Sequence, residues 1–151
     1  MKVSAKIGDL IITHALGSCL GVAVHDPVAC VGGLLHVMLP FSAIDPVKAE
    51  RNPFMFVDTG LPELLIECFK TGATRQRLEI RVAGGANSRN REEDDFFQIG
   101  KRNLVVLRKL LWKNGLLLKS HDVGGSISRT MTLEIGTGKV TIKSGGQIKN
   151  L

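Results

Sequence analysis

The residue with the clearest setting for chemistry is Cys19, which follows a Gly-Ser pair in the segment A-L-G-S-C-L-G. A turn of small residues leaves space around a thiol. It can also direct backbone N–H groups, here those of Gly17, Ser18 and Cys19, at a single point. Such groups lower a thiol pKa or stabilise an oxyanion. The competing interpretation is a small buried hydrophobic residue, which is what most free cysteines are.

The other two cysteines have no comparable setting. Cys68 falls on the apolar face of a predicted helix, and Cys30 falls in a segment rich in valine and glycine, so we expect both in the core. Three cysteines without a C-x-x-C pair argue against a disulfide framework and a zinc ribbon. No other metal spacing occurs, so we expect neither a metal nor a cofactor. Free thiols favour a reducing, cytoplasmic compartment.

A cysteine nucleophile needs a base, and a histidine is the usual choice. His36 lies in G-G-L-L-H-V-M-L-P, on a predicted strand that can pair beside the strand after Cys19. His25 adjoins a turn, so we expect it to face solvent. Spacing alone does not choose among the histidines, which are His14, His25, His36 and His121.

The elements that must position these groups follow from apolar periodicity. Short apolar or alternating runs predict strands at 7–13, 20–25, 29–39, 78–83, 116–119, 130–135 and 139–143. The first three follow one another closely, which favours antiparallel pairing among them. Residues 1–143 are predicted to be a single domain, and residues 144–151 a C-terminal tail.

Two segments instead have the spacing of amphipathic helices. One face of the first carries Leu61, Leu64, Leu65, Cys68 and Phe69; one face of the second, at about 101–114, carries Ile99, Val106, Leu107, Leu110 and Leu111. The sequence therefore predicts an α+β fold. We expect β-sandwich-like mixed or antiparallel sheets of about seven or more short strands, with the two main helices packed on one side.

A glycine pair follows the predicted strand at 78–83, in the sequence G-G-A-N. It lacks the G-x-G-x-x-G or G-K-[ST] pattern of a phosphate loop. We interpret it as a tight turn beside the site, with Gly84, Gly85 and Asn87 on the substrate side. The densely charged segment 88–95 that follows is predicted to be an exposed loop.

The net charge of +6 is uneven: residues 1–50 carry three Lys/Arg against four Asp/Glu, and residues 51–151 carry seventeen against ten. A basic surface can attract nucleic acid or an acidic protein, although scattered lysines are more often only a solvated surface. Aromatic residues are only 5%, with no tyrosine, which argues against a stacking platform for nucleic acid. No apolar run approaches membrane-spanning length, so we expect no membrane insertion.

Taken together, the motifs resemble one known family. T-H-A-L-G-S-C-L-G-V-A-V-H-D-P followed by G-G-L-L-H-V-M-L-P is similar to the chemoreceptor glutamine deamidase family CheD. The resemblance continues through F-V-D-T-G-L-P-E-L-L, L-E-I-R-V-A-G-G-A-N, I-G-K-R-N and H-D-V-G-G-S-I-S-R. The family's catalytic cysteine, histidine and threonine match Cys19, His36 and Thr13. Phe56 and His25 stand where the family commonly has tyrosine.

The resemblance implies hydrolysis of receptor glutamine side chains to glutamate and ammonia by a thiol mechanism. Cys19 would be the nucleophile, His36 the base, and Thr13 the group that orients His36. The implied partners are methyl-accepting chemotaxis receptors and a CheC-type phosphatase. The alternative is an adaptor that docks on receptors or on such a phosphatase with little or no catalysis.

Overall fold

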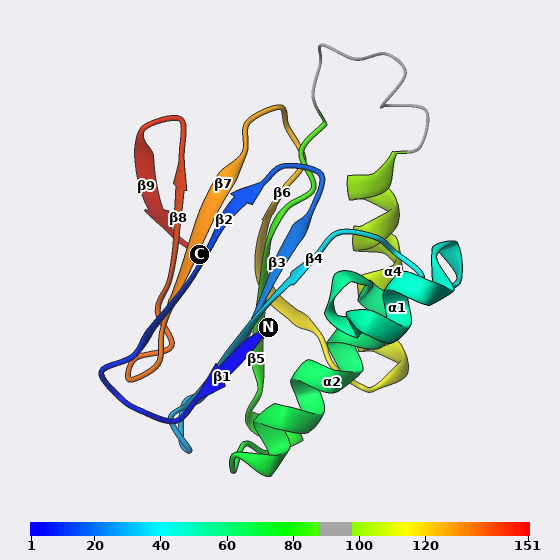
Figure 1. The fold of residues 1–151 in the computed structure, drawn as a ribbon. Helices are drawn as coiled ribbons and strands as arrows, with labels where there is room; N and C mark the ends of the chain where they lie inside the picture. The colour runs from blue at the N-terminus through cyan, green and yellow to red at the C-terminus, as the bar shows by residue number, and fades with distance from the viewer. Residues whose placement is uncertain (88–97) are drawn as a thin grey trace.

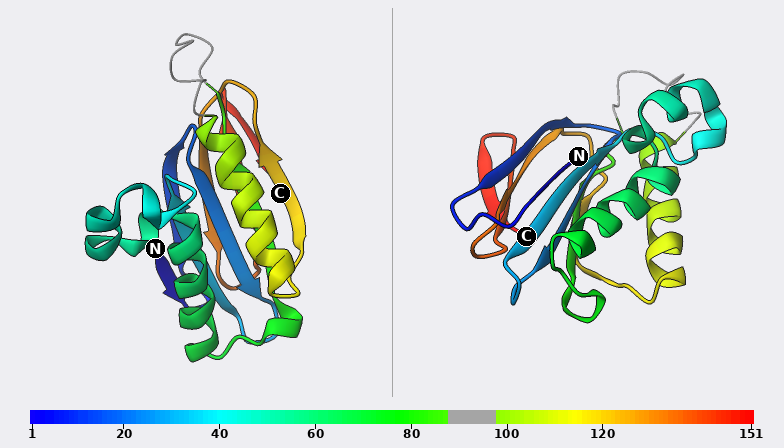
Figure 2. Two further views of the ribbon diagram at one scale, coloured as in Figure 1. Left: turned by 90° about the vertical axis from the view of Figure 1, so that its right-hand side faces the viewer. Right: turned by 60° about the horizontal axis from the view of Figure 1, so that its bottom comes forward.

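A computed structural model describes residues 1–87 and 98–151. Within them the strands form a five-stranded sheet, β1-β4-β3-β5-β6, and a four-stranded sheet, β2-β7-β8-β9. The sheets stack face to face, and helices α2 and α4 cover the outer face of the five-stranded sheet (Figures 1 and 2). The predicted α+β sandwich, with both main helices on one side, is confirmed. The bounds are β1 Lys2–Ser4, β2 Leu10–Leu16, β3 Leu20–Asp26, β4 Val31–Val37, β5 Glu79–Gly84, β6 Leu118–Val123, β7 Arg129–Glu134, β8 Val140–Ser144, β9 Gln147–Asn150, α2 Val57–Lys70 and α4 Ile99–Lys113.

Strand β3 is the centre of the fold, because every one of its residues is buried. Val22 and Val24 belong to the core beneath the helices, whereas Ala23 belongs to the core between the sheets. Alternate residues of one strand therefore fill two separate cores, as the period of two requires. β3 pairs antiparallel with both β4 and β5, while β5 pairs parallel with β6, so this sheet is mixed.

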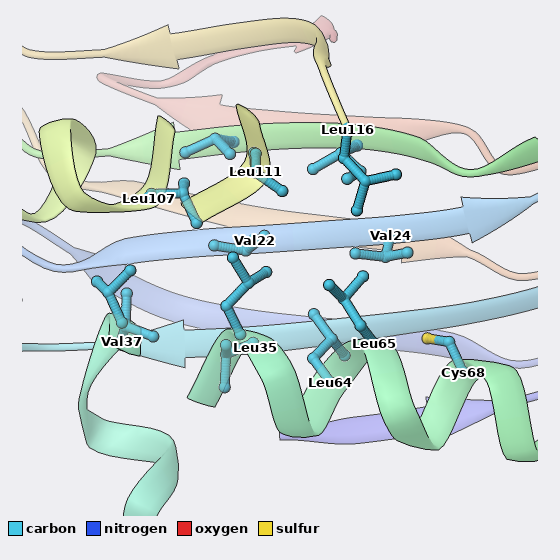
Figure 3. Packing of buried hydrophobic residues seen from close by; sticks show 14 of the residues in the cluster. Val22, Val24, Leu35, Val37, Leu64, Leu65, Cys68, Leu107, Leu111 and Leu116 are labelled. Carbon is cyan, nitrogen blue, oxygen red and sulfur yellow. The ribbon is translucent and has the colours of Figure 1, made fainter. Parts of the chain in front are cut away.

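The helices pack as their apolar spacing predicts. Figure 3 shows side chains of α2 and α4 meeting those of β3 and β4 in one continuous core. The side chains labelled there are Val22, Val24, Leu35, Val37, Leu64, Leu65, Cys68, Leu107, Leu111 and Leu116. Burying such faces against a sheet supplies most of the stability of helices of this length.

The predicted pairing of the first three strands is only half right. β3 and β4 form the expected antiparallel hairpin, but β2 pairs with β7 in the other sheet. The reason is that β4 and β5 occupy both edges of β3, so β2 has no edge there to join. Ile11 and Leu16 of β2 instead pack with Met131 and Leu133 of β7 in the core between the sheets.

The C-terminal segment 144–151 is not a loose tail, contrary to our expectation. Gly145 and Gly146 have φ of 55° and 79°, which makes a tight turn into β9, and β9 pairs antiparallel with β8. The Leu151 N–H then donates to the Val140 carbonyl at 2.9 Å, and its side chain packs against the core between the sheets. The first strand, β1, was also not predicted; it adds to the free edge of β4.

The connection from β4 to α2 consists of short helical elements: η1 (Ser42–Ile44), α1 (Pro46–Arg51) and η2 (Pro53–Met55). A further one, η3 (Arg75–Arg77), precedes β5. The charged segment 88–95, expected to be an exposed loop, lies outside the described residues. Across the two described ranges, no helix combines the length and the apolar character needed to cross a membrane.

Candidate active site

Cys19 lies in the loop between β2 and β3, at the end of the molecule where β5 ends and α4 begins (Figure 1). The loop is held by the turn after β5. The Gly85 N–H donates to the Cys19 carbonyl, and the Ala86 N–H donates to the Gly17 carbonyl, each at 2.8 Å. The Cys19 side chain is half-buried and packs at the margin of the core between the sheets. Two backbone hydrogen bonds thus fix the loop that carries the thiol.

His36 is on β4, on the same side of the sheet as Cys19. It is paired in register with Gly21, two residues after Cys19, and its neighbour Leu34 in the alternating pattern faces the core between the sheets. Residues opposite and diagonal to one another on antiparallel strands are close enough to interact. The strand pairing therefore puts His36 on the same face of the sheet as Cys19, and no hydrogen bond joins the thiol to the imidazole among the described residues.

The Thr13 hydroxyl reaches His36 from the other sheet. Thr13 Oγ1 and His36 Nδ1 are 2.8 Å apart and share a hydrogen bond. His36 Nε2, the other ring nitrogen, is buried and has no hydrogen-bond partner among the described residues. The structure therefore joins Thr13 to His36 across the two sheets and leaves Nε2 unpartnered.

Gly21 lets side chains of the other sheet pack directly against its backbone beside these groups. A Cβ atom on Gly21 would lie 2.8 Å from Leu16 Cδ1, 2.9 Å from Met131 Sδ and 3.4 Å from Thr13 Cγ2. Any side chain at this position would push into the region that His36 and Thr13 share. The glycine lets the two sheets approach closely where the hydrogen bond between them forms.

Strand alternation from Ile11 points Thr13 inward and His14 outward, and a bulge in β2 follows Thr13. The register with β7 shifts between Thr13 and Leu16, and Ala15 has φ of 57°. The two intervening residues both point outward, so Leu16 returns to the core. His14 is exposed; its Nδ1 is 3.4 Å from Thr130 Oγ1.

Burial shapes the electrostatics of both groups. It lowers the pKa of His36 below the ordinary value, so the imidazole is neutral at pH 7. Burial also raises the pKa of the Cys19 thiol, although hydrogen bonds within the loop partly oppose this. Both groups therefore stay neutral in the free protein, and the thiol must give up its proton as it attacks.

The loop's backbone donors are not all available to an oxyanion. The Gly17 N–H already donates to the Ala15 carbonyl at 2.9 Å. The N–H groups of Ser18 and Cys19 remain as the candidates that sequence reasoning put forward. Ser18 is exposed and Cys19 is half-buried.

The predicted substrate-side glycines have a structural task. Gly84 has φ of 116°, and a Cβ there would overlap the Cys19 carbonyl oxygen. Gly85 has φ of 62° and donates the hydrogen bond to Cys19 described above. Asn87 is exposed at this end of the molecule, and its N–H donates to the Gly125 carbonyl at 2.8 Å. The glycine pair shapes the loop that carries Cys19, while Asn87 stands nearer the surface.

Two of the sequence expectations for other residues are wrong. His25 does not face solvent: it is 1% exposed, its Nε2 lies 2.8 Å from the Ile135 carbonyl, and Gly138 packs on its ring. Cys30 is not in a core strand but half-buried in the turn before β4, where Val28 and Ala29 donate to the Asp26 side chain. The Asp-Pro pair marked a turn correctly but gave no sign that the preceding histidine points inward.

The remaining candidates lie elsewhere. Cys68 is buried in the core, as predicted, and burial raises its pKa to about 12. His121 is exposed, with Nε2 at 3.4 Å from Arg108. No set of three or more His, Cys, Asp or Glu side chains within the described ranges is arranged to hold a metal ion.

Sequence reasoning missed Asn103, which is completely buried against the loop that carries Cys19. Its signal was present in the periodicity: Asn103 is four residues after Ile99 and three before Val106, on the apolar face of α4. A polar side chain at such a position needs a hydrogen-bond partner, because burying it without one lowers the stability of the fold.

Comparison with known proteins identifies the family of the chain. The family model "CheD chemotactic sensory transduction" matches residues 38–144. Several relatives extend the match over nearly the whole chain, including the Cys19 loop. "Probable chemoreceptor glutamine deamidase CheD 1" of Syntrophus aciditrophicus is 46% identical over 151 residues, covering 99% of this chain and 93% of that protein.

Two further relatives carry the name "Probable chemoreceptor glutamine deamidase CheD". The Solibacter usitatus protein is 48% identical over 143 residues, which are 95% of this chain and 83% of that protein. The Pyrococcus abyssi protein is 42% identical over 157 residues, with 97% and 95% covered. The resemblance predicted from the motifs is confirmed, and the chain belongs to the CheD family.

Proposed function

We propose that this chain is a protein-glutamine deamidase that converts glutamine side chains of chemotaxis receptors to glutamate and releases ammonia. The observation that carries the proposal is the 2.8 Å hydrogen bond between Thr13 Oγ1 and His36 Nδ1, on the side of the sheet that carries Cys19. A thiol, a base and a group that orients the base are the parts of a thiol hydrolase. The names of the relatives supply the substrate class.

In the first half-reaction, His36 Nε2 takes the proton of the Cys19 thiol as the sulfur attacks the carboxamide carbon. The carbonyl oxygen becomes an oxyanion, for which the Ser18 and Cys19 N–H groups are the nearby donors. The tetrahedral intermediate then collapses. The C–N bond breaks, His36 returns its proton to the nitrogen, and ammonia leaves a thioester on Cys19.

In the second half-reaction, water attacks the thioester carbon and gives a proton to His36 Nε2. The C–S bond breaks, and the Cys19 sulfur recovers the proton from His36. The products are a glutamate side chain and the free thiol, so water supplies every added atom. Thr13 makes no bond to the substrate; it holds the His36 ring through Nδ1 in both steps.

A docking role is favoured by a separate feature, the solvent-facing side of α4. This helix contains no acidic residue, and its lysines and arginines are all exposed: Lys101, Arg102, Arg108, Lys109 and Lys113. Trp112 stands among them at 76% exposure. Cations around an exposed aromatic side chain fit an acidic protein surface. We infer that this side of α4 contacts the acidic surface of the receptor, and that a receptor or a CheC-type phosphatase is bound in the cytoplasm.

The variant Cys19→Ala distinguishes a deamidase from an adaptor that only binds, with Cys30→Ala as the matched control. A receptor cytoplasmic domain is incubated with each variant; glutamine conversion is followed by mass spectrometry and binding by titration calorimetry. If the protein is a deamidase, Cys19→Ala should bind the receptor domain but convert none of its glutamines, whereas Cys30→Ala should do both. Binding without conversion by the wild type would identify an adaptor. Conversion of free glutamine at a comparable rate would identify a small-amide hydrolase.

A further inference from the structure

Asn103 joins the two segments that carry the proposed catalytic pair. The residue is in the second turn of α4 and is 0% exposed. Its side-chain Nδ2 donates to the Met38 carbonyl at 3.0 Å and lies 3.4 Å from the Ser18 carbonyl. Ser18 directly precedes Cys19, and Met38 is two residues after His36. One amide group therefore spans from the nucleophile loop to the end of the histidine strand.

The helix that carries Asn103 is itself fixed against the catalytic loop. A Cβ on Gly100 would lie only 2.7 Å from the Gly85 Cα, so the first turn of α4 rests directly on the backbone of the turn after β5. Gly85 in turn donates to the Cys19 carbonyl at 2.8 Å. Because these contacts involve backbone atoms, the position of α4 fixes where the Asn103 amide can reach.

Asn103 is a costly residue for a structural position. Its Oδ1 is buried and has no hydrogen-bond partner among the described residues. An unpartnered buried carbonyl lowers stability, and an apolar residue of similar size avoids that cost. The nearby positions on this face of α4, Val106 and Leu107, are apolar. The two donated hydrogen bonds supply what an apolar side chain cannot: they pair two backbone carbonyls and link the segments that contain them.

We propose that Asn103 is a positioning residue that sets the separation of Cys19 and His36 by tying their two segments together. The inference rests on the proposed deamidase function. Both acceptors are carbonyls, so the Asn103 amide must present its NH₂ group to them and not its oxygen, which fixes the orientation of the amide. Misplacing reacting groups by about 1 Å costs roughly 100-fold in rate, even when the altered residue touches no substrate.

The first test uses Asn103→Leu, which keeps the branching of the side chain at Cγ and removes both donors. Asn114→Leu is the matched control, because Asn114 is the C-cap at the opposite end of α4 and its Nδ2 donates to the Leu110 carbonyl, far from the site. We expect Asn103→Leu to remain folded with a lower urea midpoint, because the Ser18 and Met38 carbonyls lose their donor. Its kcat on a receptor domain, corrected for the folded fraction, should fall roughly 100-fold with KM little changed. Asn114→Leu should keep the wild-type kcat.

A second variant covers the case in which the leucine does not fold. Asn103→Asp has the same shape, but at neutral pH it presents carboxylate oxygens to two carbonyls. A protonated carboxyl regains one donor, so the ratio of its rate to that of the wild type should rise as the pH falls. A residue with a merely structural role would not change this ratio once rates are corrected for the folded fraction.

Alkylation of Cys19 supplies a readout that needs no receptor. His36 must deprotonate the thiol, so a displaced pair should slow the labelling of Cys19 in Asn103→Leu and leave that of Cys30 unchanged. Wild-type kcat and wild-type Cys19 labelling in a folded variant without the donors would overturn the proposal. If the wild type itself converts no receptor but the labelling still changes, the deamidase proposal fails and the positioning role stands.

Discussion

The Thr13 hydroxyl can accept the Nδ1 proton of His36 and so leave the other ring nitrogen, Nε2, to act as a base. When Nδ1 donates its proton to Thr13 Oγ1, the lone pair is on Nε2, the buried nitrogen that has no partner among the described residues. A neutral hydroxyl orients the ring but stabilises an imidazolium less than a carboxylate does. His36 therefore keeps the lowered pKa that burial imposes, and it serves as a neutral base.

Thr13→Val and Thr13→Ser separate this role from strand propensity. Valine keeps the branched shape and loses the hydroxyl, whereas serine keeps the hydroxyl and loses a methyl group. We expect valine to lower kcat by roughly 10- to 1000-fold, or about 1.4–4 kcal/mol of barrier, at nearly unchanged stability. Serine should retain most of the activity. Steady-state kinetics and urea unfolding measure both, and equal rates for wild type and valine would leave a Cys-His pair without a third member.

The lowered pKa of His36 makes a pH prediction. Only the neutral imidazole can accept the thiol proton, so activity is lost as the pH falls through the His36 pKa. Because burial lowers this pKa, the acid limb of kcat/KM should lie below about 6.5, the ordinary histidine value. The profile should not fall again up to pH 8, since the thiol pKa is raised. An acid limb centred above that ordinary value would contradict the burial argument.

Single residues also show where sequence reasoning stops. Cys19 was recognisable from its small-residue turn, but His36 and Thr13 were selected through the family resemblance, because spacing does not reveal which strands pair. His25 was misplaced because the turn after it suggested solvent. Asn103 was overlooked because the sequence does not show which acceptors a single polar residue on an apolar helical face will reach; the structure shows two.

At the scale of elements, the position of the Cys19 loop depends on close contacts between backbones. The loop after β2, the turn after β5 and the first turn of α4 meet through Gly84, Gly85 and Gly100, where side chains would collide. Apolar periodicity predicted α2, α4 and β3 because each has a face that must be buried. It did not predict the place of β2, whose partner β7 is more than a hundred residues away along the chain, nor the short polar strand β9.

Gly100→Ala tests the contact between α4 and the turn after β5. Alanine in a helix is normally more favourable than glycine by about 1 kcal/mol. Here its Cβ would lie 2.7 Å from the Gly85 Cα, which is rigid backbone. We therefore expect a lower free energy of unfolding and a reduced kcat. Gly8→Ala is the control, since nothing lies within 4 Å of its Cβ position. A Gly100→Ala protein more stable and equally active would refute the close approach.

At the scale of the whole molecule, the site sits where the two sheets and the helical layer meet. β3 contributes side chains to both cores, packing against the helices on one face and against the second sheet on the other. The loop that carries Cys19 leads directly into this strand at the edge of the sandwich. Composition predicted a basic protein, and the structure locates part of that charge on the solvent-facing side of α4. The first turn of α4 borders the catalytic loop, so a receptor bound along the helix would reach the site.

Trp112→Ala tests whether this side of α4 binds the receptor. Truncation should raise KM for a receptor domain roughly tenfold, about 1.4 kcal/mol, and leave kcat unchanged. Added salt should raise KM further, because exposed charges are screened. Ile148→Ala is the control, since Ile148 is 68% exposed on β9, in the other sheet. An unchanged KM for Trp112→Ala, or an equal effect at Ile148, would place the receptor contact elsewhere.

The central claim is that Cys19 and His36 act as one unit on receptor glutamines. It is tested most directly by the conversion rate of a receptor domain, followed by mass spectrometry, with Cys19→Ala, His36→Ala and the double variant. Members of a cooperating pair are non-additive, so removing one should cost about as much as removing both. The account predicts that all three folded variants lose conversion to the same residual rate. A Cys19→Ala or His36→Ala protein that kept the wild-type rate would contradict it.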